Sequence, residues 1–160
     1  MNTLFICLAN SKKFGERCIA GIEVRKTGST YYPIKKEGKP RWIRPISKNQ
    51  SGAVGEDIVG AINLTDIIEI EIEEFCPNGY QCENVTFKPS SIKKVGNLKI
   101  SDANLDRLID MEQHNLFGNR GRAVSDDVID SVEYSLTLIK VFDFEVIRKD
   151  SDGQIRIMFE

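Results

Sequence analysis

The sequence predicts a mainly β protein built around a small barrel, and two patterns carry this prediction. Over much of the first hundred residues apolar side chains recur at every second position, as in strands with one buried face. Helical spacing of apolar residues is confined mainly to the middle of the chain. With 160 residues, 41% of them hydrophobic, the chain is large enough to bury a core and has an ordinary globular composition.

The first strands are expected over residues 4–9 and 17–24. The first run is continuously apolar, which is typical of a strand covered on both faces, and a turn at Gly15 lets the second run pair with it. Shorter strands are expected at 30–32 and 41–46, separated by the strongly cationic turn KKEGKP. The segment that follows, SKNQSGAVGED, is expected to form a loop.

The clearest strand pattern lies at residues 66–75. Three isoleucines alternate there with three glutamates: Ile68, Ile70 and Ile72 with Glu69, Glu71 and Glu73. This alternation predicts a half-buried strand with an acidic solvent face. A turn at 77–79 leads into a short strand over 84–87.

A helix is expected after Ser101, a good N-cap residue, and it should end by Gly118. Ser125 is expected to cap one more helical turn through Ile129. Strand patterns return at 134–147 and at 155–159. These elements divide the chain into a first barrel (1–100), a helical connection (101–130) and the start of a second β unit (131–160). Two strands form a marginal sheet on their own, so either they join the first sheet or, as we expect, the second unit is incomplete.

The net charge of −2 hides an uneven distribution of charge. Residues 1–50 carry eleven Lys and Arg against three Glu, whereas the remainder is acidic. Such a distribution predicts a basic face suited to phosphates, with chance variation along the surface as the alternative. The sequence has neither the roughly 18-residue apolar run of a membrane span nor the pattern of a signal peptide, so we expect a cytoplasmic protein.

Neither a metal site nor an enzyme is expected. Cys7 and Cys18 lie in apolar strand patterns, while Cys76 and Cys82 flank a turn where a hairpin would bring them face to face. This spacing lacks the close pairs that zinc prefers, and the single His114 is distant. No nucleophile accompanies His114 and no phosphate-binding glycine loop is present, so we expect no catalytic residues and no cofactor.

Three motifs resemble the dual OB-containing domain family: ICLANSKKFGERCIAG near the N-terminus, WIRPIS, and LTDIIEIEI. A weaker similarity continues through LFGNRGRAV and LTLIKV to QIRIMFE, so that it spans nearly the whole chain. The resemblance implies an OB-like β-barrel with a packed helix and a partial second OB-like unit. It also implies a link to bacterial defence and conflict systems, although a fold alone does not fix a function.

The most distinctive candidate residue is Trp42, which stands between Arg41 and Arg44. Single-stranded nucleic acids are bound by this combination, because bases stack on flat rings while cations neutralise phosphates. Two arrangements of the strand remain open. Trp42 faces the core together with Ile46, or Ile43 faces the core and places Trp42 and Arg44 on the outer face.

We therefore expect a non-catalytic module that binds single-stranded DNA or RNA within a larger defence assembly. The candidate residues are stacking rings and phosphate-binding cations: Trp42 and Tyr31 (or its neighbour Tyr32), with Lys12, Lys13, Arg17, Arg41, Arg44, Arg120 and Arg122. One alternative is an interaction module that docks an effector or ATPase without nucleic acid, since Trp, Tyr and Arg also dominate protein interfaces. Another is a sensor of small nucleotides that uses the same face.

Overall fold

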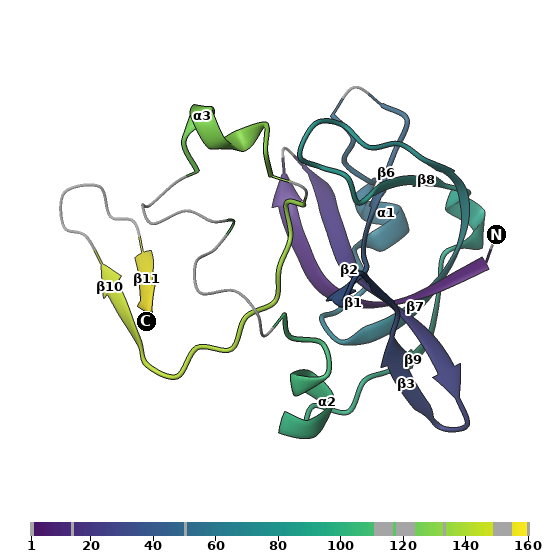
Figure 1. Cartoon of the computed structure of the whole chain (residues 1–160). Helices are drawn as coiled ribbons and strands as arrows, with labels where there is room; N and C mark the ends of the chain where they lie inside the picture. Colours follow the sequence, from purple (N-terminus) through teal and green to yellow (C-terminus); the bar gives the residue numbers. More distant parts are fainter. Residues whose placement is uncertain are drawn as a thin grey trace.

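The computed structural model describes residues 2–13, 15–49, 51–110, 117, 124–132, 134–148 and 155–159 (Figure 1). Its centre is a closed barrel of five strands: β1 (Asn2–Lys13), β2 (Glu16–Thr27), β6 (Trp42–Ile46), β7 (Asp66–Phe75) and β8 (Asn84–Phe87). They pair in the order β1-β2-β6-β8-β7 and back to β1. Only the β6–β8 pair among these is parallel. This arrangement is an OB-like barrel, so the predicted fold class is confirmed.

Smaller elements surround the barrel. Four short strands precede β6 or extend the sheet: β3 (Thr30–Pro33) pairs with β2, β4 (Lys35–Lys36) with β5 (Lys39–Pro40), and β9 (Lys93–Asn97) with β7. The helical elements are short: α1 (Glu56–Val59), the 3-10 turn η1 (Pro89–Ser91), α2 (Asp102–Asp106) and α3 (Asp126–Ile129). A separate hairpin is formed by β10 (Phe144–Arg148) and β11 (Ile155–Phe159).

Side chains of alternating residues fill the barrel and cover its outside. The interior cluster is drawn from all five barrel strands, from α1 and from Val54 just before it: Phe5, Cys7, Ile19, Ile43, Val54, Val59, Ile68, Ile70, Ile72, Val85 and Phe87. The outer cluster contains Ile6, Ile22, Val24, Ile67, Leu98 and Leu108, with Trp42, Tyr31 and Leu138 packed against it. β1 contributes to both clusters, which explains its continuous apolar run, as predicted.

The structure corrects three element predictions. Helix α2 ends at Asp106, well before Gly118, and its apolar continuation forms a turn in which Leu108 is buried against the outer cluster. The predicted strand over 134–147 is confined to β10, and residues 134–143 cross the barrel without strand pairing. The last two residues of the segment expected to be a loop (47–57) begin α1, a single turn bounded by Gly55 and Gly60. Such short turns are fixed by tertiary packing and leave little periodicity to detect.

The β10–β11 hairpin confirms the predicted pairing of the last two strands. These strands pair only with each other, and their apolar side chains Phe144, Val146, Ile155 and Ile157 are exposed. The proposed division of the chain into a first barrel and an incomplete second unit stays a prediction. Among the described helices, none has the length and apolar character needed to cross a membrane.

Candidate nucleic-acid interface

Strand β6 places its side chains alternately inside and outside the barrel. Ile43 and Pro45 are buried, while Trp42 and Arg44 are half-buried. Because Ile43 joins the interior cluster and Trp42 packs against the outer one, the second arrangement left open by the sequence is the one adopted. The indole is therefore both a packing anchor and an accessible surface.

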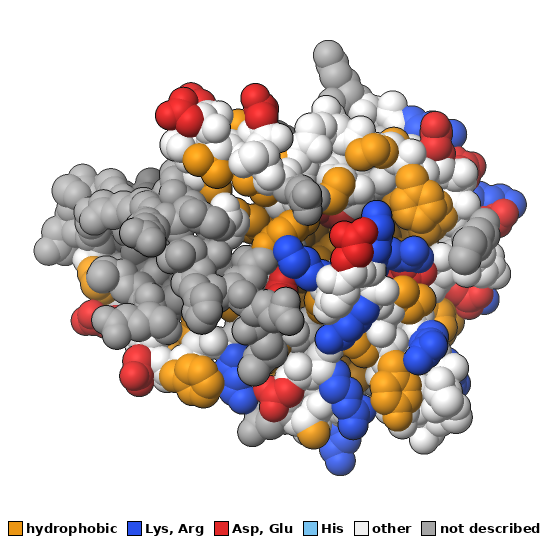
Figure 2. Space-filling model, viewed as in Figure 1, with side chains coloured by type: hydrophobic (Ala, Val, Ile, Leu, Met, Phe, Trp, Pro, Cys, Tyr) orange, Lys and Arg blue, Asp and Glu red, His pale blue; other side chains and the backbone are white. Residues whose placement is uncertain are grey.

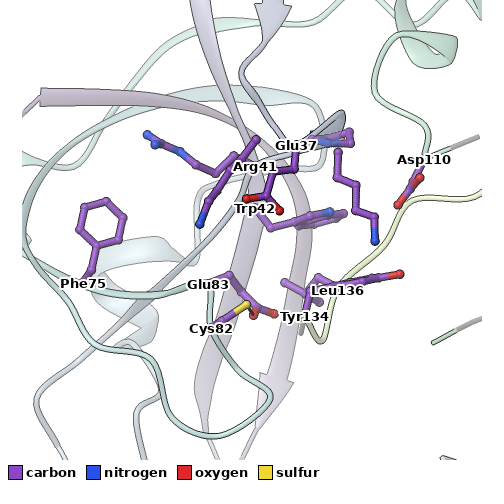
Figure 3. A pocket seen from close by; sticks show the side chains of 12 residues that line it. Glu37, Arg41, Trp42, Phe75, Cys82, Glu83, Asp110, Tyr134 and Leu136 are labelled. Atoms are coloured by element: carbon purple, nitrogen blue, oxygen red, sulfur yellow. Dashed lines mark hydrogen bonds between the residues drawn. The ribbon is translucent and has the colours of Figure 1, made fainter. Parts of the chain in front are cut away.

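Trp42 lines a cleft of about 630 Å³ on the outside of the barrel, which we call the aromatic cleft (Figure 3). Its walls come from the β4–β5 turn, the start of β6, the β7–β8 loop and the chain after α3. Two further aromatic residues line it, Tyr134 and Phe75, and Phe75 stands apart from Trp42 in the close-up. Lys39 also lines the cleft, with its Nζ 4.6 Å from the centroid of the Tyr134 ring.

Three of the five arginines predicted to bind phosphates, Arg17, Arg41 and Arg44, each form an ion pair with a glutamate. Arg17 binds Glu56 through two hydrogen bonds of 2.5 and 2.7 Å, and the Arg17 guanidinium holds the pKa of Glu56 below its ordinary value. Arg41 pairs with Glu23, and Arg44 lies 3.2 Å from Glu83. The side chains of Glu23 and Glu83 are only 4% and 3% exposed, so these arginines neutralise buried carboxylates.

Of the other predicted cations, Lys12 does not line the aromatic cleft. Lys12 is exposed at the end of the β1–β2 hairpin, and Lys13 follows it on the same strand. Arg120 and Arg122 lie outside the described residues. On the face shown in Figure 2, Lys and Arg side chains are interspersed with hydrophobic and acidic ones and form no continuous basic patch.

The predicted second stacking ring, Tyr31, packs against the outer cluster on β3, with Lys26 Nζ 5.7 Å from its centroid. Its neighbour Tyr32 is more exposed and lies under the guanidinium of Arg107. Neither tyrosine lines the aromatic cleft. The structure thus places Tyr134 rather than Tyr31 beside Trp42.

A second hollow, the polar groove, is lined by residues of both β2 and β6. It measures about 490 Å³, and nearly half of its lining residues carry hydroxyl or amide side chains: Ser11, Ser47, Asn49, Ser51, Asn78, Gln81 and Asn84. Leu136 lines both hollows. The extended residues 134–138, which we call the crossing segment, therefore lie between the aromatic cleft and the polar groove.

Polar contacts hold the crossing segment to the barrel. The guanidinium of Arg44 donates a 2.8 Å hydrogen bond to Ser135 Oγ, and the Ser135 hydroxyl donates to the Glu83 carboxylate. The backbone N–H of Asp110 donates to the carbonyl of Leu138, whose side chain packs against the outer cluster. Arg44 and Glu83 thus serve as the anchor of this segment.

Sequence reasoning missed three residues of the aromatic cleft: Lys36, Lys39 and Tyr134. The lysines belong to the cationic turn KKEGKP, which was noted but not assigned to the site. Tyr134 lies far along the chain from Trp42, and no local pattern connects them. Only the path of the chain after α3 brings this ring to the barrel.

The described residues contain no group of three or more His, Cys, Asp or Glu arranged to hold a metal ion. None of the four cysteines forms a disulfide. Cys7 lies in the barrel interior, where burial raises the pKa of its thiol to about 11. The groups that line the cleft are aromatic rings, ammonium and guanidinium groups, carboxylates and the Cys82 thiol.

The closed five-stranded barrel, with hollows beside its third strand, defines an OB-fold protein. The family model described as "Dual OB-containing domain" matches residues 4–160. The chain belongs to this family, as its motifs predicted. No curated protein and no solved structure matches the chain.

Proposed function

We propose that this protein is a non-catalytic module that binds single-stranded DNA or RNA at the aromatic cleft. The observation that carries the proposal is the position of the cleft. It combines Trp42 and Tyr134 with Lys36 and Lys39 beside β6, the third strand of the barrel. OB folds bind oligonucleotides on the face formed by their second and third strands.

The burial of Trp42 supports a stacking role. Its ring packs against the outer cluster, which fixes its orientation, while the rest of its surface lines the cleft. A base that stacks on such a held ring avoids much of the entropic cost of ordering it. Stacking on one aromatic side chain contributes roughly 1–3 kcal/mol per base.

The positive charge available to phosphates comes from lysines. Within the described part of the chain, no salt bridge involves Lys36 or Lys39, in contrast to Arg17, Arg41 and Arg44. An ammonium group without a carboxylate partner binds a phosphate without first breaking an ion pair. This favours Lys36 and Lys39 over the arginines as the phosphate-binding groups.

The intrinsic fluorescence of Trp42 tests the proposal directly, because it is the only tryptophan of the chain. Oligo(dT) or oligo(U) is expected to quench this emission, and to do so less at higher salt. The double substitution K36Q/K39Q should weaken binding at least about tenfold. Lys88, which pairs with Glu71 beyond the far end of β8, provides the matched control K88Q. Absence of any change with both oligonucleotides would refute the proposal.

We also propose, from the family resemblance, that the module acts in a cytoplasmic bacterial defence assembly. A second candidate function, docking of a protein partner, is favoured by the exposed apolar side chains of the β10–β11 hairpin. The double substitution V146T/I157T distinguishes docking of a protein partner from nucleic-acid binding. Docking predicts loss of protection against phage with oligonucleotide binding intact, whereas unchanged protection would exclude a docking role for this face.

A further inference from the structure

We propose that the aromatic cleft binds the terminal nucleotide of a single strand, including a terminal phosphate, and not the interior of the strand. This inference rests on the proposed function and names the part of the ligand that the cleft recognises. It follows from the path of the crossing segment, from the size of the cleft and from the charges that line it.

The crossing segment closes the path that a continuous strand would follow. Leu136 forms a wall shared by the aromatic cleft and the polar groove, and Ser135 is hydrogen-bonded to both Arg44 and Glu83. A strand that ran through both hollows would have to displace this serine. Glu83, which is buried, would then lose a hydrogen bond that water could not easily replace. A strand that ends in the cleft avoids this loss.

The size of the cleft suits one nucleotide. Its volume of about 630 Å³ falls within the range of about 300–1,000 Å³ that is typical of sites for small molecules. Trp42 offers a ring surface for a base, Leu136 offers an apolar wall beside it, and Tyr134 holds the Lys39 ammonium over its own ring (Figure 3). Several successive bases would need an open groove along the barrel instead.

The charges in the cleft match one phosphate of high charge. A terminal phosphate monoester carries about −1.5 to −2 at pH 7, whereas an internal diester carries a single charge. Lys36 and Lys39 provide two ammonium groups for it. Glu37 lines the same cleft, and its carboxylate would repel further phosphates. The charges of the cleft therefore favour one terminal phosphate over several internal phosphodiesters.

The experiment compares oligo(dT) probes of one length: linear with a phosphate at either end, linear without phosphate, and covalently circular. We expect a phosphorylated linear probe to bind at least about tenfold more tightly than the circular probe, which has no terminus. Thymidine monophosphate is expected to compete with the phosphorylated probe and to quench Trp42. Equal affinity for linear and circular probes would overturn this inference and leave the proposed function standing, whereas binding of no probe would overturn both.

Two variants make the test specific. K39Q should reduce the preference for the phosphorylated end, while K88Q should retain it. S135A removes two hydrogen bonds of the crossing segment, so the circular probe should gain affinity relative to the linear one. An unchanged emission maximum of Trp42 in the free variants would show that the barrel is intact. If K39Q weakened linear and circular probes equally, or if thymidine monophosphate failed to compete at saturation, the inference would be wrong.

Discussion

At the level of single residues, the arginines near Trp42 contribute to stability before they contribute to recognition. Arg41 and Arg44 compensate Glu23 and Glu83, two carboxylates that are almost completely removed from solvent. An uncompensated buried charge is costly, so such pairs resist opening. The residues that remain available to a ligand are the lysines of the β4–β5 turn and the open part of the indole.

Loss of one partner of the Arg44–Glu83 pair should destabilise the protein. We expect R44A to lower the free energy of unfolding by about 3 kcal/mol, because Glu83 is left buried without its cation. The double substitution R44M/E83L should recover most of this loss, since it removes both charges together. Urea denaturation measures both effects. A cost for R44A of only about 0.5 kcal/mol, as for ordinary surface positions, would contradict the buried pair.

Asp66 should make stability depend on pH in the acid range. Burial disfavours its charged form, but hydrogen bonds from Lys94, the Asn63 backbone and Asn97 outweigh burial and hold the pKa of Asp66 below its ordinary value. Its stabilising contribution is therefore complete above the ordinary pKa of about 3.9 and is lost as the pH falls through the lower value in the folded protein. The difference in unfolding free energy between wild type and D66N should shrink below about pH 4. Parallel pH profiles would contradict this assignment.

The cysteines should differ strongly in reactivity. Cys7 is completely buried with a thiol pKa of about 11, and Cys82 is exposed. Since the thiolate is the reactive form, we expect iodoacetamide at about pH 8 to modify Cys82 first and Cys7 only after unfolding. Mass spectrometry of the peptides at successive times measures the order. Early modification of Cys7 in the folded protein would be inconsistent with its position in the interior.

At the level of elements, the barrel depends on the close approach of β1 and β2. The two backbones approach each other most closely around Gly21, which is paired with Cys7 in the register of the two strands. A Cβ atom added at Gly21 would lie 1.9 Å from the carbonyl oxygen of Ile6 and 2.7 Å from the Phe5 ring. This position therefore requires glycine for space, which the sequence pattern of β2 does not reveal.

The substitution G21A should consequently destabilise the barrel by about 2–3 kcal/mol, as overpacked sites do. Gly96 on β9 is a suitable control, because a Cβ there would have its nearest contact at 3.4 Å, with the hydroxyl of Tyr31. We expect G96A to change the unfolding free energy by less than about 1 kcal/mol. Thermal or urea denaturation measures the effect of each variant. Equal effects of G21A and G96A would argue against a close approach of β1 and β2 at Gly21.

At the level of the whole molecule, the chain after β9 covers one side of the barrel. Leu108 and Leu138 bury the outer cluster, and the crossing segment between them lies across the face on which OB folds hold their ligands. In Figure 1 this part of the chain passes from α3 along the side of the barrel to β10. The crossing segment supplies Tyr134 to the aromatic cleft, and in the proposal above it also limits the length of nucleic acid that fits there.

Binding of an unphosphorylated oligonucleotide should depend only weakly on salt. Each phosphate neutralised on a single strand contributes about −0.7 to the slope of log K against log salt concentration. Two free lysines predict a slope of about −1.4, whereas the five N-terminal cations expected from the sequence would give about −3.5. Titrations followed by Trp42 fluorescence at several salt concentrations measure this slope. A steep slope would show that the arginine pairs open on binding.

Much of the fold was predictable because strand periodicity is a local property. The alternating isoleucines and glutamates fixed β7, and the apolar runs located β1 and β2 near their observed positions. The inward position of Ile43 remained one of two alternatives, since a strand pattern does not say which face is buried when both sides carry apolar residues. The partners of the arginines were not predictable, because they lie on other elements.

The sequence by itself determined a β-barrel of the OB type, the family to which the chain belongs, and Trp42 as its most distinctive side chain. Tertiary structure alone decided that Arg17, Arg41 and Arg44 are ion-paired, and that Tyr134, Lys36 and Lys39 share a cleft with Trp42. The physical reason is the sequence distance over which each property is set. Strand periodicity depends on neighbouring residues, whereas charge compensation and cleft formation depend on segments that meet only when the chain has folded.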